Sequence, residues 1–369
     1  MRISSLLAAV MTGLVGVAGT VGLASPASAM FSPSPVGPQW EPDGPVHAVV
    51  TAGDLVIVGG SFSGGVAALD AGTGALQWRG TANGDVRALA MSADGNHVVA
   101  GGAFTSVSGV THRKLAALSV DSGVADARWK PAVGGTVRDI VVAGDIAYFG
   151  GSFQGHNGIA QKGLGAVKVT PGVKARSVVP AFDATTDGIV YSLALAGSKL
   201  VVGGRFTQVN GTPRSQLAAV NLTTYALDAW APAAACLKCT LYWDLIADGS
   251  TVYGASRNAG AVTRIEVGNA KHSWRTSANG DAQALTLVDG TLYAGGHFTA
   301  IRGEERIILA ALHPRTGVVQ PDFVPRFVGT FPGIWAMDST SARLYAGGHF
   351  THVGPASRNK RPYLAMFGV

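Results

Sequence analysis

One short phrase recurs along this chain of 369 residues, an apolar run that ends in Gly-Gly-x-Phe. Its clearest copies span residues 200–207 and 292–299, and a degenerate copy spans 252–256. The other copies carry the glycine pairs Gly59-Gly60, Gly101-Gly102, Gly150-Gly151 and Gly347-Gly348. Neighbouring copies start about 40 to 53 residues apart, the length of a unit that folds into one small sheet. Such units cannot bury their apolar faces alone, so each must pack against its neighbours.

Each unit contains four strand-like runs separated by Gly, Asp and Pro turns. In the fourth unit these include residues 190–195, the run into Gly203-Gly204, and residues 217–220. Short apolar, β-branched runs of this kind predict strands, and we expect no helix after residue 29. The fourth run ends on an aromatic residue, in order Trp78, Trp129, Phe182, Trp230, Trp274 and Phe323.

The last unit stops before its fourth run, and residues 37–42, which contain Trp40, resemble the missing piece. The sequence therefore predicts an all-β fold, a seven-bladed β-propeller of four-stranded antiparallel blades. The last blade would be closed by the N-terminal strand of the mature chain.

The first 29 residues have the pattern of a secretory signal peptide: Arg2, a mostly apolar run, and the small-residue site Ala27-Ser28-Ala29. An uncleaved membrane anchor is the competing interpretation. We expect residues 30–369 to form a single domain that is secreted and extracellular, with attachment to the cell envelope left open. In that compartment Cys236 and Cys239 are expected to form a local disulfide.

Charge argues against a nucleic-acid partner. The formal net charge is +6, but only 14% of residues are charged and no Lys/Arg run forms a stripe. No second apolar stretch reaches the ~20 residues of a membrane span. We expect a monomer with no cofactor.

Two resemblances support the repeat assignment. Residues 68–78 resemble the tryptophan docking motif of quinoprotein dehydrogenase propellers, which implies that Trp78 packs between neighbouring blades. Residues 101–118 and 203–220 resemble the delta-sixty repeat of secreted bacterial β-propellers, and this likeness covers nearly all of residues 30–369. The delta-sixty family is largely a domain of unassigned function, so it implies a fold and export but no activity.

The first strand of every unit carries a variable residue two positions before a constant apolar one, and the period of two places both on one side. These larger polar or aromatic residues should form a ring near the channel mouth, on the face with the long loops. We expect the ring to bind a ligand through hydrogen bonds and aromatic contacts, or else to fill the channel. Its members are His47, Arg87, Arg138, Tyr191, Trp243, Gln283 and Trp335, with Trp243 placed to within one residue.

The function predicted from these features is extracellular binding of a glycan, peptide or protein. A carbohydrate-active hydrolase or lyase is the first alternative, with Asp139 and Asp244 as weak catalytic candidates; whether the chain is an enzyme stays open, with binding favoured. A structural cell-envelope scaffold is the second. No metal site is predicted, although His297 and His349, at the x of Gly-Gly-x-Phe, are weak ligand candidates.

Overall fold

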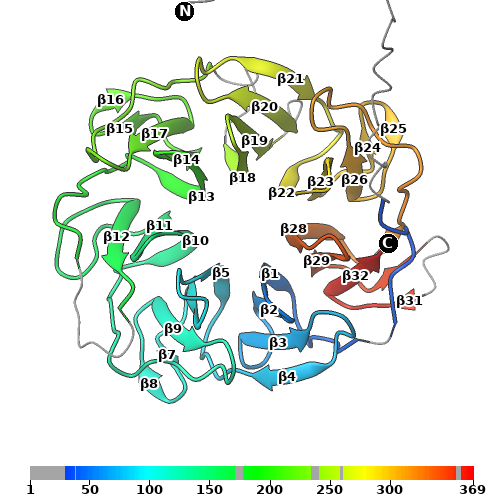
Figure 1. Ribbon diagram of the computed structural model, residues 1–369, viewed down its shortest axis with the longest axis horizontal. Helices are drawn as coiled ribbons and strands as arrows, with labels where there is room; N and C mark the ends of the chain where they lie inside the picture. The colour runs from blue at the N-terminus through cyan, green and yellow to red at the C-terminus, as the bar shows by residue number, and fades with distance from the viewer. Residues whose placement is uncertain (1–29, 38, 171–177, 234–240, 258–260, 355–358) are drawn as a thin grey trace, which may run out of the picture.

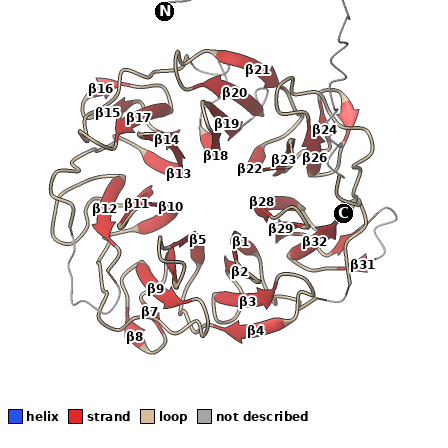
Figure 2. Ribbon diagram, in the orientation of Figure 1, coloured by secondary structure: helices blue, strands red, loops and turns tan. Residues whose placement is uncertain are grey.

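The computed structural model describes residues 30–37, 39–170, 178–233, 241–257, 261–354 and 359–369. Throughout these ranges the chain consists of strands and loops without any helix (Figures 1 and 2). The described part accordingly holds no helix long and apolar enough to cross a membrane. The expected signal peptide and the two cysteines lie outside the described residues.

Small antiparallel sheets surround a common axis (Figure 1), and each presents one strand to that axis. Each of these innermost strands lies beside the next, and β28 lies beside β1. The innermost strands are β1 (Val46–Ala52), β5 (Val86–Met91), β10 (Thr136–Ala143), β13 (Ile189–Ala196), β18 (Tyr242–Asp248), β22 (Ala282–Val288) and β28 (Gly333–Ser339).

The second and third strands of each sheet are buried on both faces, because each sheet is covered by the sheets before and after it. Most of their sequences are therefore apolar runs rather than alternating ones. The second strands are β2 (Leu55–Gly60), β6 (His97–Gly102), β11 (Ile146–Ser152), β14 (Lys199–Arg205), β19 (Thr251–Ser256), β23 (Thr291–Gly296) and β29 (Arg343–His349). The third strands are β3 (Val66–Asp70), β9 (Leu115–Ser119), β12 (Leu164–Lys168), β17 (Leu217–Asn221), β20 (Val262–Glu266), β26 (Leu309–Leu312) and β32 (Leu364–Gly368).

The fourth run differs from the sequence prediction. Only β4 (Leu76–Arg79) and β21 (His272–Thr276) complete four-stranded sheets in the described residues. Elsewhere single bridges, such as Leu118 with Ala125, stand in that place. The fourth runs that stay irregular contain a proline, Pro131, Pro180, Pro232 or Pro321. Proline cannot donate to a ladder, and neither β4 nor β21 contains one.

The loops after Gly-Gly-x-Phe fold back as short hairpins at one end of the sheets. They contain β7 (Ser106–Val107), β8 (Val110–Thr111), β15 (Gln208–Val209), β16 (Thr212–Pro213), β24 (Ala300–Ile301) and β25 (Glu304–Glu305). In the last unit β27 (Phe327–Val328), β30 (His352–Val353) and β31 (Asn359–Lys360) form a small sheet of their own.

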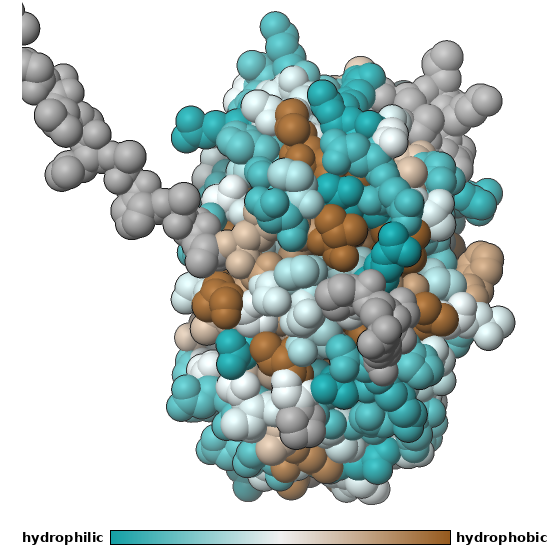
Figure 3. Space-filling view, turned by 90° about the vertical axis from the view of Figure 1, so that its right-hand side faces the viewer, coloured by the Kyte–Doolittle hydropathy of each residue, from teal (hydrophilic) through white to brown (hydrophobic). Residues whose placement is uncertain are grey.

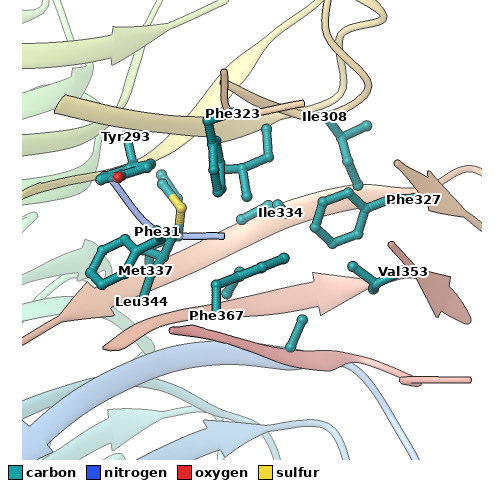
Figure 4. Close-up of a cluster of buried hydrophobic side chains, with 14 of the residues drawn as sticks. Phe31, Tyr293, Ile308, Phe323, Phe327, Ile334, Met337, Leu344, Val353 and Phe367 are labelled. Atoms are coloured by element: carbon teal, nitrogen blue, oxygen red, sulfur yellow. The ribbon is translucent and has the colours of Figure 1, made fainter. Parts of the chain in front are cut away.

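The two ends of the described chain meet. Ser32 N donates to Gly368 O (2.6 Å) and Val36 N donates to Met366 O (2.8 Å), beside a bridge between Pro35 and Phe367. The pairing segment therefore precedes the expected one, since residues 39–42 form no strand. Phe31 is 4% exposed and packs near Tyr293, with ring centroids 5.5 Å apart, in the cluster shown in Figure 4.

Tryptophans link successive sheets at their outer turns. Nε1 of Trp78, Trp129 and Trp274 donates to the backbone oxygen of Val120, Lys168 and Pro314, at 2.6, 2.8 and 2.9 Å. Apolar burial between sheets and these bonds hold the ring together. The outer side seen in Figure 3 is mostly hydrophilic, with its hydrophobic residues in small separate patches.

Candidate functional site

A β-bulge interrupts every innermost strand near its start, and the bulged residue is a member of the predicted ring. In β1 the pairing passes from Val46–Gly60 to Ala48–Gly59, which leaves His47 without a partner. The same shift leaves out Arg87, Arg138, Tyr191, Trp243, Gln283 and Trp335 in the other six strands. Bulges re-aim side chains beside functional sites. They, rather than a continuous alternation, direct these seven side chains toward the axis.

Glycine pairs lie opposite six of the seven bulges. Opposite Arg87, a Cβ on Gly102 would lie 2.0 Å from the backbone oxygen of Asp85, and one on Gly101 would lie 2.6 Å from the Val137 side chain of the next sheet. Only glycine permits both approaches. The seventh bulge, at Trp243, lies opposite Ala255 and Ser256, so a Gly-Gly pair accompanies most of the bulges but is not required for one.

All seven ring side chains line one pocket of about 420 Å³, which we call the mouth pocket. His297 and Phe331 line it as well. The bulges lie at the end of the sheets where the innermost strands begin, which is also where the strands that carry Gly-Gly-x-Phe end. The mouth pocket therefore opens on the side with the long loops, and its volume suits a small molecule or the end of a polymer.

Aromatic rings form one arc of the mouth pocket. Trp335 lies between His47 and His349, with ring centroids 5.1 and 6.0 Å away and interplanar angles of 8° and 9°. His297 lies 5.2 Å from Phe331, whose side chain is 79% exposed. Burial, together with the charge of Arg87, lowers the pKa of His47 to about 4, against the opposing charge of Asp85. His47 is therefore neutral at pH 7.

Charged and polar groups form the next part of the ring. Arg87 pairs with Asp85 at 2.5 Å, and the Ser61 hydroxyl donates to the other Asp85 oxygen at 2.8 Å. Because that hydroxyl proton is used, Nε2 of His47 donates to Ser61 Oγ, 2.7 Å away. Burial opposes ionisation of Asp85, but the Ser61 bond and the Arg87 charge hold its pKa below the usual value.

Arg138 and Tyr191 continue the ring. The Arg138 guanidinium carbon lies 4.9 Å from the centroid of the Tyr191 ring, a cation–π contact. Tyr191 in turn meets Trp243 edge to face at 4.7 Å. No carboxylate in the described residues pairs with Arg138.

A smaller cavity of about 150 Å³ continues below the ring and contains Asp139, Ser192 and Asp244. Asp139 accepts backbone N–H groups from Ile140 (2.8 Å) and, across sheets, from Leu193 (2.6 Å). Asp244 does the same for Leu245 (2.8 Å) and Leu285 (2.7 Å). The two candidate carboxylates therefore join neighbouring innermost strands, with Ser192 between them bonded to Leu245 N at 2.8 Å.

Burial raises the pKa of both carboxyl groups. That of Asp139 reaches about 7, because burial and the nearby Asp244 outweigh the N–H donors of Leu193 and Ile140. That of Asp244 reaches about 6 through burial, against the N–H donors of Leu285 and Leu245. Every carboxylate oxygen already holds a backbone donor, which is the geometry of a strand-joining cap.

The remaining candidate residues lie in different places. His297 lines the mouth pocket, and His349 supports Trp335 from behind. Within the described ranges no three His, Cys, Asp or Glu side chains gather to hold a metal ion. Cys236 and Cys239 lie outside those ranges. Sequence reasoning missed Phe331; the signal was an aromatic residue beside Pro332-Gly333 in a loop that leads directly into an innermost strand.

Comparisons with known proteins support the fold. Residues 39–160, less than half of the chain, match the family model described as outer membrane protein assembly factor BamB. A search of the curated proteins finds no match.

Solved structures resemble most of the chain. U3-55K superposes with a TM-score of 0.62 at 10% identity, over 90% of this chain and 100% of that one. The WD40 β-propeller domain of Doa1 gives 0.58 at 10% identity, over 90% and 96%. The computationally designed Ika8 protein gives 0.56 at 12% identity, over 91% and 100%. The chain therefore has a β-propeller fold; at these identities the likeness extends to the fold alone.

Proposed function

We propose that this chain is a secreted, seven-bladed β-propeller that binds an extracellular glycan, peptide or protein at the mouth pocket. The observation that carries the binding proposal is the set of seven bulges. Each sheet departs from regular pairing at the same point and thereby turns a large, different side chain into one cavity. A packing role alone would be met by the small or apolar residues found one or two positions further along, such as Ala48 and Val49.

The blade count rests on the innermost strands. Each lies beside its successor, and β28 lies beside β1; these contacts support a ring of seven. The backbone bonds of Ser32 and Val36 to β32 support closure of the last blade by the N-terminal segment. Export and kinship with the delta-sixty repeat rest on residues 1–29 and on the Gly-Gly-x-Phe units.

A binding screen tests the function. The purified protein would be applied to arrays of neutral and acidic glycans, to a peptide library and to proteins of a culture supernatant. A matched variant would carry Arg87→Ala and Arg138→Ala, and a control would carry Arg315→Ala in an exposed turn. We expect a ligand that is retained by the protein and the control but not by the double variant. Equal retention by all three would remove the mouth pocket as the site, and release of shortened glycan would replace binding by the enzyme alternative.

A further inference from the structure

The mouth pocket holds one cation without a described counter-ion. Arg87 is neutralised by Asp85, whereas Arg138 has the face of Tyr191 as its described neighbour. Its Nε atom is buried and has no hydrogen-bond acceptor among the described residues. Five other arginine Nε atoms are buried without an acceptor, but their guanidinium groups bond elsewhere to carboxylate, hydroxyl or backbone oxygens, whereas Arg138 has no such bond in the described residues. Leaving a whole guanidinium unsatisfied in a partly buried site is costly, so Arg138 indicates an acceptor supplied from outside the chain.

Two further polar atoms on the same arc are buried and unpartnered in the described structure. Trp243 Nε1, a donor, follows Arg138 and Tyr191 around the ring, and Gln283 Oε1 follows Trp243. A buried indole N–H ordinarily finds an acceptor. Oε1 of Gln283 needs a hydrogen-bond donor; if the amide is flipped, its N–H₂ group lies there instead and needs an acceptor. A hydroxyl can serve as either.

The opposite arc offers ring surface instead of charge. Both faces of Trp335 are covered by histidines, so the open aromatic surface is that of Phe331 and the adjacent His297. His47 on this arc is neutral at pH 7. The carboxyl groups below the ring, Asp139 and Asp244, have all their oxygens bonded to backbone N–H groups, which leaves the arginine side open to an anion.

We infer that the mouth pocket binds the carboxylate of an acidic sugar, with the carboxylate at Arg138 and Trp243, a hydroxyl at Gln283 and the sugar ring beside Phe331 and His297. This inference rests on the proposed binding function and specifies its ligand class. A carboxylate supplies acceptors for both orphan donors, and an arginine–carboxylate bond is charge-assisted. A hydroxylated ring supplies the other two contacts, and the volume of about 420 Å³ admits one or two sugar units.

Matched ligands on the unaltered protein give the first test. Isothermal titration calorimetry would compare galacturonate and glucuronate di- and trisaccharides with their carboxyl-reduced, neutral counterparts. We expect the acidic member of a pair to bind at least about tenfold more tightly, the range of one charge-assisted hydrogen bond. Equal affinity within every pair would overturn the inference and leave the proposed function standing.

Variants give the second test. Arg138→Gln should weaken binding of the acidic probe about tenfold or more and leave the neutral probe within about twofold. Arg315→Gln, in an exposed turn away from the pocket, should change neither. Melting midpoints of all three proteins report folding. An acidic probe that binds Arg138→Gln as tightly as the unaltered protein would overturn the carboxylate placement.

A peptide arm separates the sources of a carboxylate. Peptides would be offered with a free C-terminal carboxylate and as the C-terminal amide. Binding of peptides but of no sugar would overturn the acidic-sugar inference and preserve the binding function. Failure of every sugar and peptide to bind would overturn the acidic-sugar inference; the proposed function would be overturned only if the proteins of the culture supernatant also failed to bind.

Discussion

Trp335 stacks on His47 across the junction between the last and the first innermost strands, with ring centroids 5.1 Å apart and planes within 8°. His349 covers the opposite face of the indole. The ring contact thus joins the beginning of the described sheets to their end at the mouth pocket. Trp335 presents only its edge to a ligand, so it positions its neighbours and is no open stacking surface.

Acidification should destabilise the protein through His47. Its folded pKa of about 4 lies below the ordinary value of 6.5, so the unfolded chain takes up a proton that the folded chain does not. The stabilisation is fully present above pH 6.5 and is lost as the pH falls through about 4. Relative to His47→Gln, the unaltered protein should lose on the order of 1 kcal/mol over this window.

Thermal melts of both proteins at several values between pH 7.5 and 4 measure that difference. His352→Gln, in the β30 hairpin and outside the mouth pocket, is the matched control. If the melting midpoints of the unaltered protein and His47→Gln change in parallel with pH, the prediction that His47 is buried and neutral is wrong.

The contact between sheets at Trp78 can be isolated with two glycines. Gly123 (φ +67°) and Gly109 (φ +71°) share a left-handed backbone, so alanine strains both by about 1 kcal/mol. A Cβ on Gly123 would lie 2.4 Å from the Trp78 ring, whereas one on Gly109 meets open space. Gly123→Ala should therefore cost about 1–3 kcal/mol more than Gly109→Ala in urea unfolding. Equal costs would show that the indole does not rest on that turn.

The N-terminal segment should contribute to stability through Phe31. The ring is buried against Tyr293 and the last sheets, so Phe31→Ala should destabilise the protein by about 3–5 kcal/mol. The matched control is Phe331→Ala, at a 79% exposed ring, which should shift stability by less than about 0.5 kcal/mol. Unfolding midpoints that move equally for the two variants would contradict the packing of Phe31.

Phe331 should contribute to ligand binding, although it contributes little to stability. Its ring is the open aromatic surface of the mouth pocket, so Phe331→Ala should weaken ligand binding by about 0.5–1.5 kcal/mol and leave the melting midpoint unchanged. Calorimetry with whichever probe the screen identifies measures the loss. Val328→Ala, an exposed change in the neighbouring β27, should leave affinity unaltered; a similar loss there would point to a general disturbance of the loop.

The repeat made the propeller fold and the ring of seven residues predictable, because comparing the units with one another shows which positions they share even where a single unit is irregular. The bulge itself was not predicted: an apolar strand with an extra residue has the same composition as one without. The expected fourth strands are mostly absent from the described sheets, because prolines such as Pro131 and Pro321 remove ladder donors from those runs, which the strand prediction did not take into account. Phe331 and the unpartnered Trp243 N–H depend on contacts between units, which no spacing within one unit encodes.

Asp139 supplies the last prediction, and its sign is opposite to that of His47. Its folded pKa of about 7 lies above the ordinary value of 3.8, so the folded chain holds a proton that the unfolded chain has released. The stabilisation is fully present below pH 3.8 and is lost as the pH rises through about 7. Asp139→Asn abolishes the titration but sets an amide N–H₂ against the N–H of Leu193 or Ile140, a pH-independent cost of about 1–3 kcal/mol.

The stability difference between the unaltered protein and Asp139→Asn should therefore be largest near pH 4 and should shrink toward pH 8. Asp244→Asn should show the same trend with its window ending lower, near pH 6. Asp54→Asn, in the exposed turn between β1 and β2, provides the baseline. Melting midpoints measured across this range test the prediction. A stability difference that is constant with pH would mean that Asp139 stays ionised in the folded protein, because its backbone N–H donors stabilise the charge more than burial destabilises it.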